Sequence, residues 1–463
     1  MGDREIHAER HMSDVESLMW NLDKDPRLAN TIGNLTIFDQ PLDRERFRTR
    51  LERAVEVVPR LHQRVVRGFG RLAPPEWRRD PDFDLDHHLR WISLGGEADR
   101  RDLYDAVMTI FGDPFDRARP LWEFTIIEGL GEGAAMLQRL HHTLMDGEGG
   151  LRISEQFVDF ERSAVEPDAI EAPFIDDNSD EGLIGTLAGT AAHVTRRTLG
   201  ATQRGAAQVA TSLRHPTEAV HLGQQAVDLT GSALRQARVD RRQLSPLWTS
   251  RSLRRWFGTI DVSLDDVRTV AKRHGVSVND VFVAGAARGA GRYHSDRGAS
   301  VDALRMAMPV SRRRDGSAGG NMFGLTQTEV PTDGRDASQQ LNTIGSLLAR
   351  TKSDPAVGAF EGMAGLVNLL PTSVLIRSAF RLASSVDFTT SNLRAAPVDV
   401  FMGGSLIEAT YPIGPLSGTA FNLTTMSYRG VLNMGLVVDA GAIDEPEHLR
   451  AAIETAFAEL TAA

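Results

Sequence analysis

The chain has 463 residues, of which 41% are hydrophobic and 25% are charged. At roughly 150 residues per domain, this length predicts two or three domains, each with its own core. The 52 basic and 62 acidic residues give a formal net charge of −10, and an acidic chain lacks the basic surface that nucleic-acid binding requires. The chain has no cysteine, which excludes disulfides, thiolate catalysis and cysteine metal sites.

No stretch of the chain reaches the roughly 20 apolar residues that a membrane-spanning helix requires. Residues 1–12 are polar and mixed in charge, unlike a secretory signal peptide. We therefore expect a cytoplasmic protein. The 42 glycines and 20 prolines are too few for a low-complexity chain.

The first third of the sequence alternates between strand and helix patterns. Pro59 predicts the end of an amphipathic, arginine-rich helix, and glycines at 129, 131 and 133 predict the turn of a hairpin. The expected elements are a strand at 34–38, helices at 42–57 and 102–111, hairpin strands at 122–128 and 134–140, and a helix at 151–160.

The composition changes between residues 166 and 250. Acidic residues dominate the first part, and Ala, Gln, Thr and Arg at helical spacing follow over 183–209 and 217–239. These patterns are only moderately apolar, which favours a long helical linker packed across two cores. We therefore expect an N-terminal domain at 1–165, the linker at 166–250 and a second α/β domain at 251–463.

The last third predicts a second α/β unit. Ser263 is expected to cap the first helix of this unit and Gly275 to end it. Gly285, Gly289 and Gly291 lie inside the next helix pattern without a following Lys-Ser or Lys-Thr pair, so they indicate close helix packing rather than a nucleotide loop. The expected elements are helices at 264–273, 281–293, 341–352, 367–382 and 447–460, and strands at 304–310, 323–330, 421–427 and 432–439.

One motif stands out where the second hairpin strand ends, running from His141-His142 to Asp146-Gly147. On an extended backbone the two histidines point to opposite faces, so one can face a cavity while the other packs inward. Histidine is well suited to accept a proton near neutral pH. Asp146 can orient an imidazole or pair with a distant arginine, and Gly147 leaves room for a substrate.

Two other interpretations of this motif stay open on the residues alone. The histidines could form a satisfied pair in the core. They could also bind a metal, but no third ligand follows at a local spacing, so we predict no metal site.

The spacing His141-His142-x-x-x-Asp146-Gly147 resembles the signature of the CoA-dependent acyltransferase superfamily, which includes peptide-synthetase condensation domains. Other segments are similar to the bacterial wax ester synthase/diacylglycerol acyltransferase family within it, from about Met12 to the end of the chain. These segments are Pro120-Leu121-Trp122-Glu123, Val278-Asn279-Asp280-Val281, 308–312 with 320–321, 81–88, and 422–424 with 427–428.

This resemblance implies an α/β fold of the two-layer α+β kind, with two chloramphenicol acetyltransferase-like domains joined by the helical linker. His142 would be the general base, His141 would support the loop, and Asp146 would be mainly structural. Asn279 and Asp280 would hold the second domain against the site. The implied reaction is O-acyl transfer from a long-chain acyl-CoA, the co-substrate, to diacylglycerol or a fatty alcohol, with no permanently bound cofactor.

The chain has neither a cysteine nor a serine-nucleophile elbow, so we expect direct attack of the acceptor hydroxyl on the thioester. Backbone N–H groups after His142 are candidate donors to the oxyanion. Acceptors of this kind occur in membranes and lipid droplets, so the resemblance also implies peripheral association with such a surface. Six arginines could meet the CoA phosphates or equally form a solvated basic face: those at 251, 254, 255, 312, 313 and 314.

The sequence departs from the family at one stretch. The family carries Ser-Asn-Val-Pro-Gly-Pro where this chain has Ser391-Asn392-Leu393-Arg394-Ala395-Ala396-Pro397. Loss of the fixed φ of proline and the freedom of glycine is expected to change the path of this loop and the choice of acceptor. Two alternatives therefore stay open: acyl transfer to another hydroxyl or amine, and a non-catalytic relative that binds acyl-CoA or coats lipid droplets.

Overall fold

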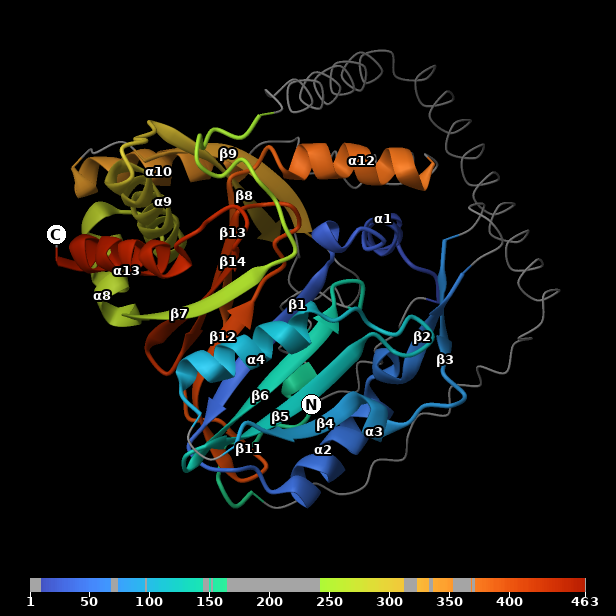
Figure 1. Ribbon diagram of the computed structural model, residues 1–463. Helices are drawn as coiled ribbons and strands as arrows, with labels where there is room; N and C mark the ends of the chain where they lie inside the picture. Colours follow the sequence, from blue (N-terminus) through green and yellow to red (C-terminus); the bar gives the residue numbers. More distant parts are fainter. Residues whose placement is uncertain are drawn as a thin grey trace, which may run out of the picture.

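Two six-stranded mixed sheets form the frame of the molecule, and helices cover them (Figure 1). The α/β fold class predicted from the sequence is confirmed. The structure is a computed structural model that describes residues 10–67, 74–95, 98–144, 150, 153–164, 242–311, 323–332, 336–352, 368 and 371–462.

The first sheet combines strands from both ends of the chain. β1 lies at its centre and pairs antiparallel with both β12 and β6. Residues 401–413, which fall within the predicted C-terminal domain, therefore complete the sheet of the N-terminal one. The spatial order is β11 (Phe401–Met402), β12 (Ser405–Ile413), β1 (Thr31–Phe38), β6 (Gly133–His141), β5 (Trp122–Leu130) and β4 (Leu89–Ser93).

The second sheet is built from the last third of the chain. Its strand β10 runs parallel to both neighbours, β13 and β8, while the other pairs are antiparallel. The order is β7 (Arg255–Ser263), β14 (Val431–Asp439), β13 (Phe421–Tyr428), β10 (Phe388–Arg394), β8 (Ala303–Ser311) and β9 (Phe323–Pro331). Four helices pack together beside it (Figure 1): α8 (Leu264–His274), α9 (Val278–Asp296), α10 (Ala337–Lys352) and α13 (Pro446–Ala462).

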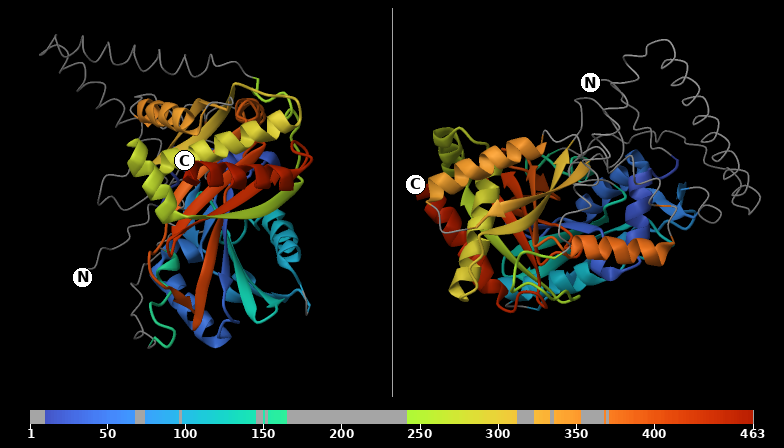
Figure 2. Two further views of the ribbon diagram at one scale, coloured as in Figure 1. Left: turned by 90° about the vertical axis from the view of Figure 1, so that its left-hand side faces the viewer. Right: turned by 90° about the horizontal axis from the view of Figure 1, so that it is seen from above.

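The remaining elements surround the first sheet or join the two halves. α12 (Thr372–Ala383) contacts α1 (Asp14–Leu22) and lies away from α13 (Figures 1 and 2). Among the helices that the structure describes, none has both the length and the apolar character needed to cross a bilayer. The other elements are α2 (Arg44–Val57), α3 (Leu85–His88), α4 (Arg100–Gly112), the 3₁₀ turns Pro26–Leu28 and Pro59–His62, and the hairpin β2 (Gln63–Val66) and β3 (Glu76–Arg79).

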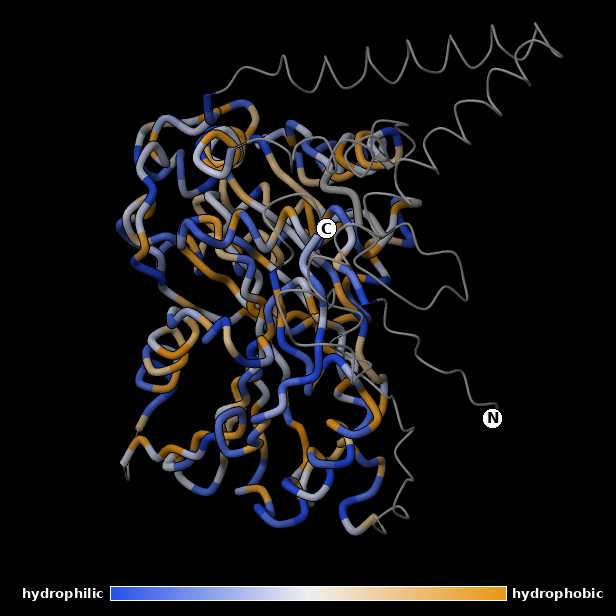
Figure 3. The backbone as a smooth tube through the Cα atoms, turned by 90° about the vertical axis from the view of Figure 1, so that its right-hand side faces the viewer, coloured by the Kyte–Doolittle hydropathy of each residue, from blue (hydrophilic) through white to orange (hydrophobic). Residues whose placement is uncertain are grey.

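Apolar side chains form one core in each half and a third between the sheets. The third core joins Leu35 of β1, Ile413 of β12 and Val107 of α4 to Phe257 of β7 and Val437 of β14. Complete burial of such side chains stabilises each by about 1.5–3 kcal/mol, so this core fixes the two sheets against each other. Figure 3 shows that the helices carry both hydrophobic and hydrophilic residues around their turns, as expected for helices with one buried side.

Local signals predicted helix ends well. The Ser263 hydroxyl accepts a hydrogen bond from the Asp266 N–H at 3.3 Å, and Gly275 ends α8 with a left-handed φ of 65°. Both predictions are confirmed. Local sequence patterns did not predict α1, α3, β2, β3, β4, β7, β10, β11 or β12. β10 and β12 carry polar residues toward the interior between the sheets, so they lack the apolar alternation of a surface strand.

The helix predicted at 151–160 is wrong over most of its described part. Ile153 and Ser154 are helical, and the chain then turns. The N–H and C=O groups of Asp159 pair with Phe401 of β11, both at 2.8 Å. The Asp159 carboxylate binds Arg46 and Arg50 of α2 at 2.8 and 2.7 Å. These long-range bonds favour an extended backbone where local periodicity favoured a helix. The helices predicted at 183–209 and 217–239 lie outside the described residues.

Three glycines let α9 pack closely against its neighbours, as the sequence predicted. A Cβ at Gly285 would lie 2.5 Å from the Phe457 ring, and one at Gly289 would lie 2.4 Å from the Ile453 Cα, both on α13. At Gly291 it would lie 2.5 Å from a backbone oxygen. At Gly289 and Gly291 the contacted atoms belong to the backbone, so the neighbouring segment itself would have to move.

We predict that Gly289→Ala lowers the free energy of unfolding by about 1–3 kcal/mol, because the added methyl group overpacks the α9–α13 contact. Urea unfolding measures this. Gly112→Ala at the end of α4 is the control, because nothing lies within 4 Å of a Cβ there and loss of chain entropy in the unfolded state favours alanine. Equal stabilities of the two variants would contradict this packing argument.

Candidate active site

A cavity of about 730 Å³ lies between the two sheets, within the range of roughly 300–1,000 Å³ typical of sites for small organic ligands. Both sheets, α1 and α12 contribute to its wall. Residues 414, 415, 417 and 419 also line it, on the segment that leads from β12 in the first sheet to β13 in the second. The cavity therefore forms where the chain crosses between the halves.

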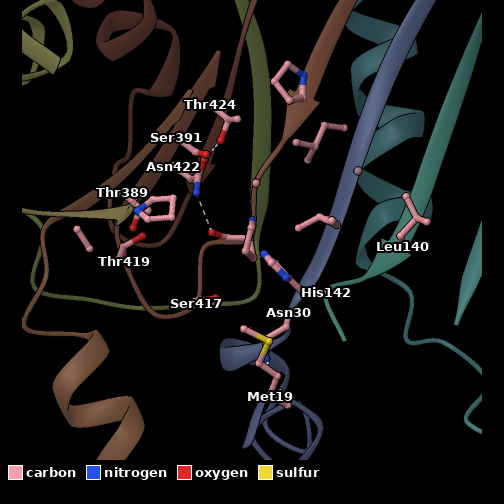
Figure 4. Close-up of a pocket in the computed structure, with 18 of the residues that line it drawn as sticks. Met19, Asn30, Leu140, His142, Thr389, Ser391, Ser417, Thr419, Asn422 and Thr424 are labelled. Carbon is pink, nitrogen blue, oxygen red and sulfur yellow. Dashed lines mark hydrogen bonds between the residues drawn. The ribbon is translucent and has the colours of Figure 1, made fainter. Parts of the chain in front are cut away.

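The wall has an apolar part and a polar part. The helices supply apolar side chains, namely Val15, Leu18 and Leu22 of α1 and Leu375 and Leu382 of α12. The second sheet supplies hydroxyls and amides, which lie together on one side of the view in Figure 4. They include Thr389 and Ser391 of β10 and Asn422 and Thr424 of β13. Such a site can hold a long hydrocarbon chain at one end and a polar group at the other.

Strand β6 presents His142 to this cavity. Gln138, Leu140 and His142 line the wall, at the two-residue spacing of one face of a strand. The His142 backbone N–H donates to the carbonyl of Asn30 at 2.8 Å. Its ring is partly exposed and points from the end of β6 into the cavity (Figure 4). The imidazole can therefore meet a ligand in the cavity.

His141 points away from the cavity and is only 1% exposed. Its N–H donates to the Leu121 carbonyl at 2.9 Å. Its Nδ1 lies 2.8 Å from the Thr143 hydroxyl and accepts the Thr143 N–H at 3.2 Å. Its Nε2 lies 3.5 Å from the Asp23 carboxylate. Each ring nitrogen thus faces a polar group of the protein.

The rest of the motif, Asp146 and Gly147, lies outside the described residues, as do the arginines at 312–314. Their predicted roles stay predictions. Within the part of the chain that the structure describes, no group of three or more His, Asp or Glu side chains is placed to hold a metal ion.

The predicted segment Pro120-Leu121-Trp122 is buried at the start of β5, beside β6. None of its three residues lines the cavity. The Trp122 indole donates to the Leu61 carbonyl at 2.7 Å and stacks on His88 with ring centres 4.6 Å apart. Burial lowers the pKa of His88 to about 4, so this ring is neutral at physiological pH. Together with the bond from His141 to Leu121, this packing fixes the end of β6.

Asn279, Ser391 and Asn392 reach the same cavity as His142 from the opposite sheet and from α9. The Asn392 amide donates to the Asn279 carbonyl oxygen at 3.5 Å. Asp280 does not reach the cavity. Its carboxylate accepts the Ser277 N–H at 2.8 Å and closes the capping box at the start of α9, which holds the helix end that presents Asn279.

The altered stretch after Asn392 continues as a strand. β10 runs through Arg394 beside β13, and the Ala395 N–H donates to the Ser427 carbonyl at 3.0 Å. Arginine and alanine each carry an N–H group, whereas proline has none to donate to a sheet. The residues that replace the Pro-Gly pair of the family therefore permit β10 to pair with β13 as far as Ala395.

The sequence analysis missed Asp23 and Asn30, which contact the two histidines, and it predicted α12 as a helix without a place at the cavity. Asp23 and Asn30 lie more than 100 residues before the motif, and β1, which starts next to Asn30, pairs with β6. No local pattern could have signalled this proximity. Asn422 and Thr424 line the cavity. Their segment is similar to the family in sequence, but that similarity did not predict a place for them at the site.

The fold is shared with solved acyltransferases. The wax ester synthase/diacylglycerol acyltransferase from Marinobacter aquaeolei VT8 superposes with a TM-score of 0.63 at 21% identity, over 97% of this chain and 98% of its own. The first condensation domain of the calcium-dependent antibiotic synthetase gives a TM-score of 0.60 at 16% identity, over 98% and 97%. The predicted fold of two acyltransferase-like domains is therefore confirmed.

Sequence comparisons identify the family. A family model for the wax ester synthase/diacylglycerol acyltransferase catalytic domain matches residues 12–282, and one for the C-terminal domain matches residues 319–461. A Mycobacterium tuberculosis protein named putative diacylglycerol O-acyltransferase is 31% identical over 453 residues, which cover 97% of this chain and 91% of that protein. Another M. tuberculosis protein, named probable diacylglycerol O-acyltransferase, is 27% identical over 93% of this chain and 94% of its own. The histidine motif at the cavity and these full-length matches together show that the chain belongs to the wax ester synthase/diacylglycerol acyltransferase family of acyltransferases.

Proposed function

We propose that this protein transfers a long-chain acyl group from acyl-CoA to the hydroxyl of diacylglycerol, of a fatty alcohol, or of both, with His142 as the general base. One observation carries the proposal: the second histidine of the motif stands in the wall of a largely apolar cavity. The names of the M. tuberculosis and Marinobacter relatives support the two acceptor classes.

The proposed reaction needs no covalent intermediate on the protein. The His142 imidazole takes the proton of the acceptor hydroxyl while the oxygen attacks the thioester carbonyl carbon. The tetrahedral intermediate then collapses, the carbon–sulfur bond breaks, and the imidazolium returns the proton to the departing thiolate. The products are an ester and free CoA. A positioned general base of this kind contributes about 10²–10⁴-fold to the rate.

Asn279 and Asn392 are the side-chain donors that we propose for substrate oxygens, because the N–H groups of Thr143 and Leu144 directly after His142 already donate to His141. The Asn279 amide nitrogen donates to a thioether, the Met308 sulfur at 3.7 Å, and sulfur is a weak acceptor. A carbonyl oxygen of a ligand is a better acceptor for that group. Preorganised donors in a water-poor site stabilise charge that develops on such an oxygen.

Acyl-CoA is the proposed co-substrate, with no permanently bound cofactor. A mutant starter condensation domain of rhizomide synthetase was solved in complex with C8-CoA and Leu-SNAC, and it superposes on this chain with a TM-score of 0.57 at 15% identity. That likeness is one of fold. It supports the proposal because the same two-sheet arrangement accommodates an acyl-CoA there.

We predict that His142→Ala lowers the kcat of thiol release from palmitoyl-CoA, with diacylglycerol or hexadecanol as acceptor, by about 10²–10⁴-fold. His448→Ala is the control, because that side chain is 39% exposed on α13 and pairs with Asp296. Product analysis must show ester formation in step with thiol release. Equal ester formation by His142→Ala and wild type would overturn the general-base assignment.

The acceptor identity is tested by the same assay with other hydroxyls and with amines. The proposal expects esters of diacylglycerol or fatty alcohols to form fastest. Faster transfer to an amine or to a different hydroxyl would favour the broader acyltransferase alternative. Binding of acyl-CoA without any CoA release would favour the non-catalytic alternative.

We further propose that the protein associates peripherally with a membrane or lipid droplet through α12. Val374 and Leu382 of this helix are 46% and 48% exposed, and Arg377 and Arg381 beside them are also exposed. Leu382 lines the cavity as well, so the apolar surface is continuous with the cavity wall. Apolar residues flanked by basic ones are typical of helices that bind anionic lipid surfaces.

The double variant Val374→Glu/Arg377→Glu is expected to reduce binding to vesicles of phosphatidylcholine and phosphatidylglycerol by about tenfold or more, because each basic residue near an anionic surface contributes about 1 kcal/mol. Neither residue lines the cavity. Val398→Glu is the matched control, since Val398 is 51% exposed away from α12. Co-sedimentation measures binding, and equal binding by both variants would refute this docking surface.

A further inference from the structure

A carboxylate lies directly behind the histidine pair. Asp23, the residue that caps the C-terminal end of α1, has a side chain only 17% exposed. Its oxygens lie 3.5 Å from His141 Nε2 and 2.9 Å from Arg117 Nη2, and they accept the Asn30 N–H at 3.1 Å. The three contacts come from three separate segments of the chain, so the carboxylate ties them together.

The contacts of His141 assign its tautomer. The Thr143 N–H donates to His141 Nδ1, so that nitrogen is an acceptor and the neutral ring carries its proton on Nε2. Nε2 is the nitrogen that faces Asp23. An ionised carboxylate next to an N–H group holds both the tautomer and the orientation of an imidazole.

Asp23 is ionised at this position. Burial would raise the pKa of Asp23, but the neighbouring His141 ring and the hydrogen bonds from Arg117 and the Asn30 N–H hold that pKa below its ordinary value. The charge on Asp23 is therefore present throughout the neutral pH range.

Two aromatic rings enclose His141. Trp20 and Phe115 meet its ring edge-on, with centroids 6.1 and 6.4 Å away. Each ring also carries a guanidinium, Arg117 at 3.9 Å over Trp20 and Arg139 at 4.7 Å over Phe115. These contacts hold the orientation of the His141 ring.

Asn30 connects the same carboxylate to His142. Its N–H donates to Asp23, while its carbonyl accepts the N–H of His142 at 2.8 Å. The Asn30 side chain donates to the Met19 and Leu28 carbonyls at 3.3 and 3.1 Å, so this residue is itself fixed. Asp23 thus contacts the ring of His141 directly, and it is connected to the backbone N–H of His142 through Asn30.

We propose that Asp23 is a positioning residue for acyl transfer, which acts through His141 and Asn30 to fix the backbone from which His142 presents its imidazole to the cavity. This inference rests on the proposed function. Asp23 does not line the cavity, so it acts without touching substrate.

The charged groups around His141 and His142 determine how Asp23 affects the pH dependence of kcat. Removing the negative charge of Asp23 leaves neighbouring positive charges less compensated, which disfavours the protonated form of the nearby His142 imidazole. Among the described residues, the other charged groups around Asp23 and His141 include Arg117, Arg255 and Arg139, which lies on the same side of β6 as His141. Arg139 in turn has Glu123 and Asp113 near it.

The test is Asp23→Asn in the full-length chain, a substitution that keeps the shape and removes the charge. We expect kcat for thiol release from palmitoyl-CoA to fall roughly tenfold to hundredfold, because small misplacement of a reacting group costs up to about 10²-fold. The KM for palmitoyl-CoA should stay within about twofold, and the acid limb of the pH–kcat profile should move to lower pH. Asp23→Glu should restore part of the rate.

Asp25→Asn is the matched control. Asp25 lies two residues away, has a side chain 12% exposed and pairs with Arg27 at 2.7 Å rather than with either histidine, so we expect wild-type kcat and pH profile. Arg117→Gln is a second variant that keeps the test decisive if Asp23→Asn does not fold. It removes a positive charge near the histidines, so its acid limb should move to higher pH.

The outcomes separate this inference from the proposed function. Wild-type kcat and an unmoved acid limb in folded Asp23→Asn, with an active wild type, would overturn the positioning role alone. A wild type that forms no ester, while Asp23→Asn also forms none, would overturn the proposed function. If Asp23→Asn does not fold, a wild-type kcat together with an unmoved acid limb in Arg117→Gln, which removes a partner of the Asp23 carboxylate, would overturn the positioning role.

Discussion

The antiparallel pairing of β12 with β1 is the interaction on which the rest of the structure depends. It takes a strand from the last quarter of the chain and adds it to the sheet that carries the histidines. The chain then passes directly into β13 of the second sheet. Because both sheets share this connection, the crossing segment closes one side of the cavity and sets the distance between its walls.

Polar contacts of the buried side chains Thr410, Tyr411 and Asn433 reinforce this pairing. The Asn34 amide of β1 donates to the Thr410 hydroxyl of β12 at 2.8 Å. The Tyr411 hydroxyl of β12 donates to Asp261 of β7 at 2.9 Å, and Asn433 of β14 donates to the same carboxylate at 2.7 Å. A buried polar group left without a hydrogen-bond partner lowers the free energy of unfolding by about 1–3 kcal/mol. These bonds therefore favour one register between the two halves over others that would leave the groups unpaired.

The two-residue period of β6 divides the chemistry of the site. Gln138, Leu140 and His142 face the cavity, while Arg139 and His141 are buried on the other side of the strand. The cavity side is available to ligands. The buried side holds the charges and rings that fix the strand end. Adjacent histidines in the sequence thus occupy two environments, so that His142 is accessible to a ligand in the cavity while His141 is enclosed by the protein.

The sequence by itself determined much of this protein, because several signals are local. Ser263 and Gly275 marked the ends of α8, the glycines of α9 indicated close packing, and the hairpin and the two adjacent histidines placed the candidate base at a strand end. The resemblance of the motif then implied the family, which the comparisons show. Only the tertiary structure decided the rest. It placed β12 in the first sheet, turned the expected helix near Asp159 into an extended segment, and brought Asp23 and Asn30 to the histidines. In each case the deciding bonds join residues far apart in the chain, and local periodicity carries no information about such partners.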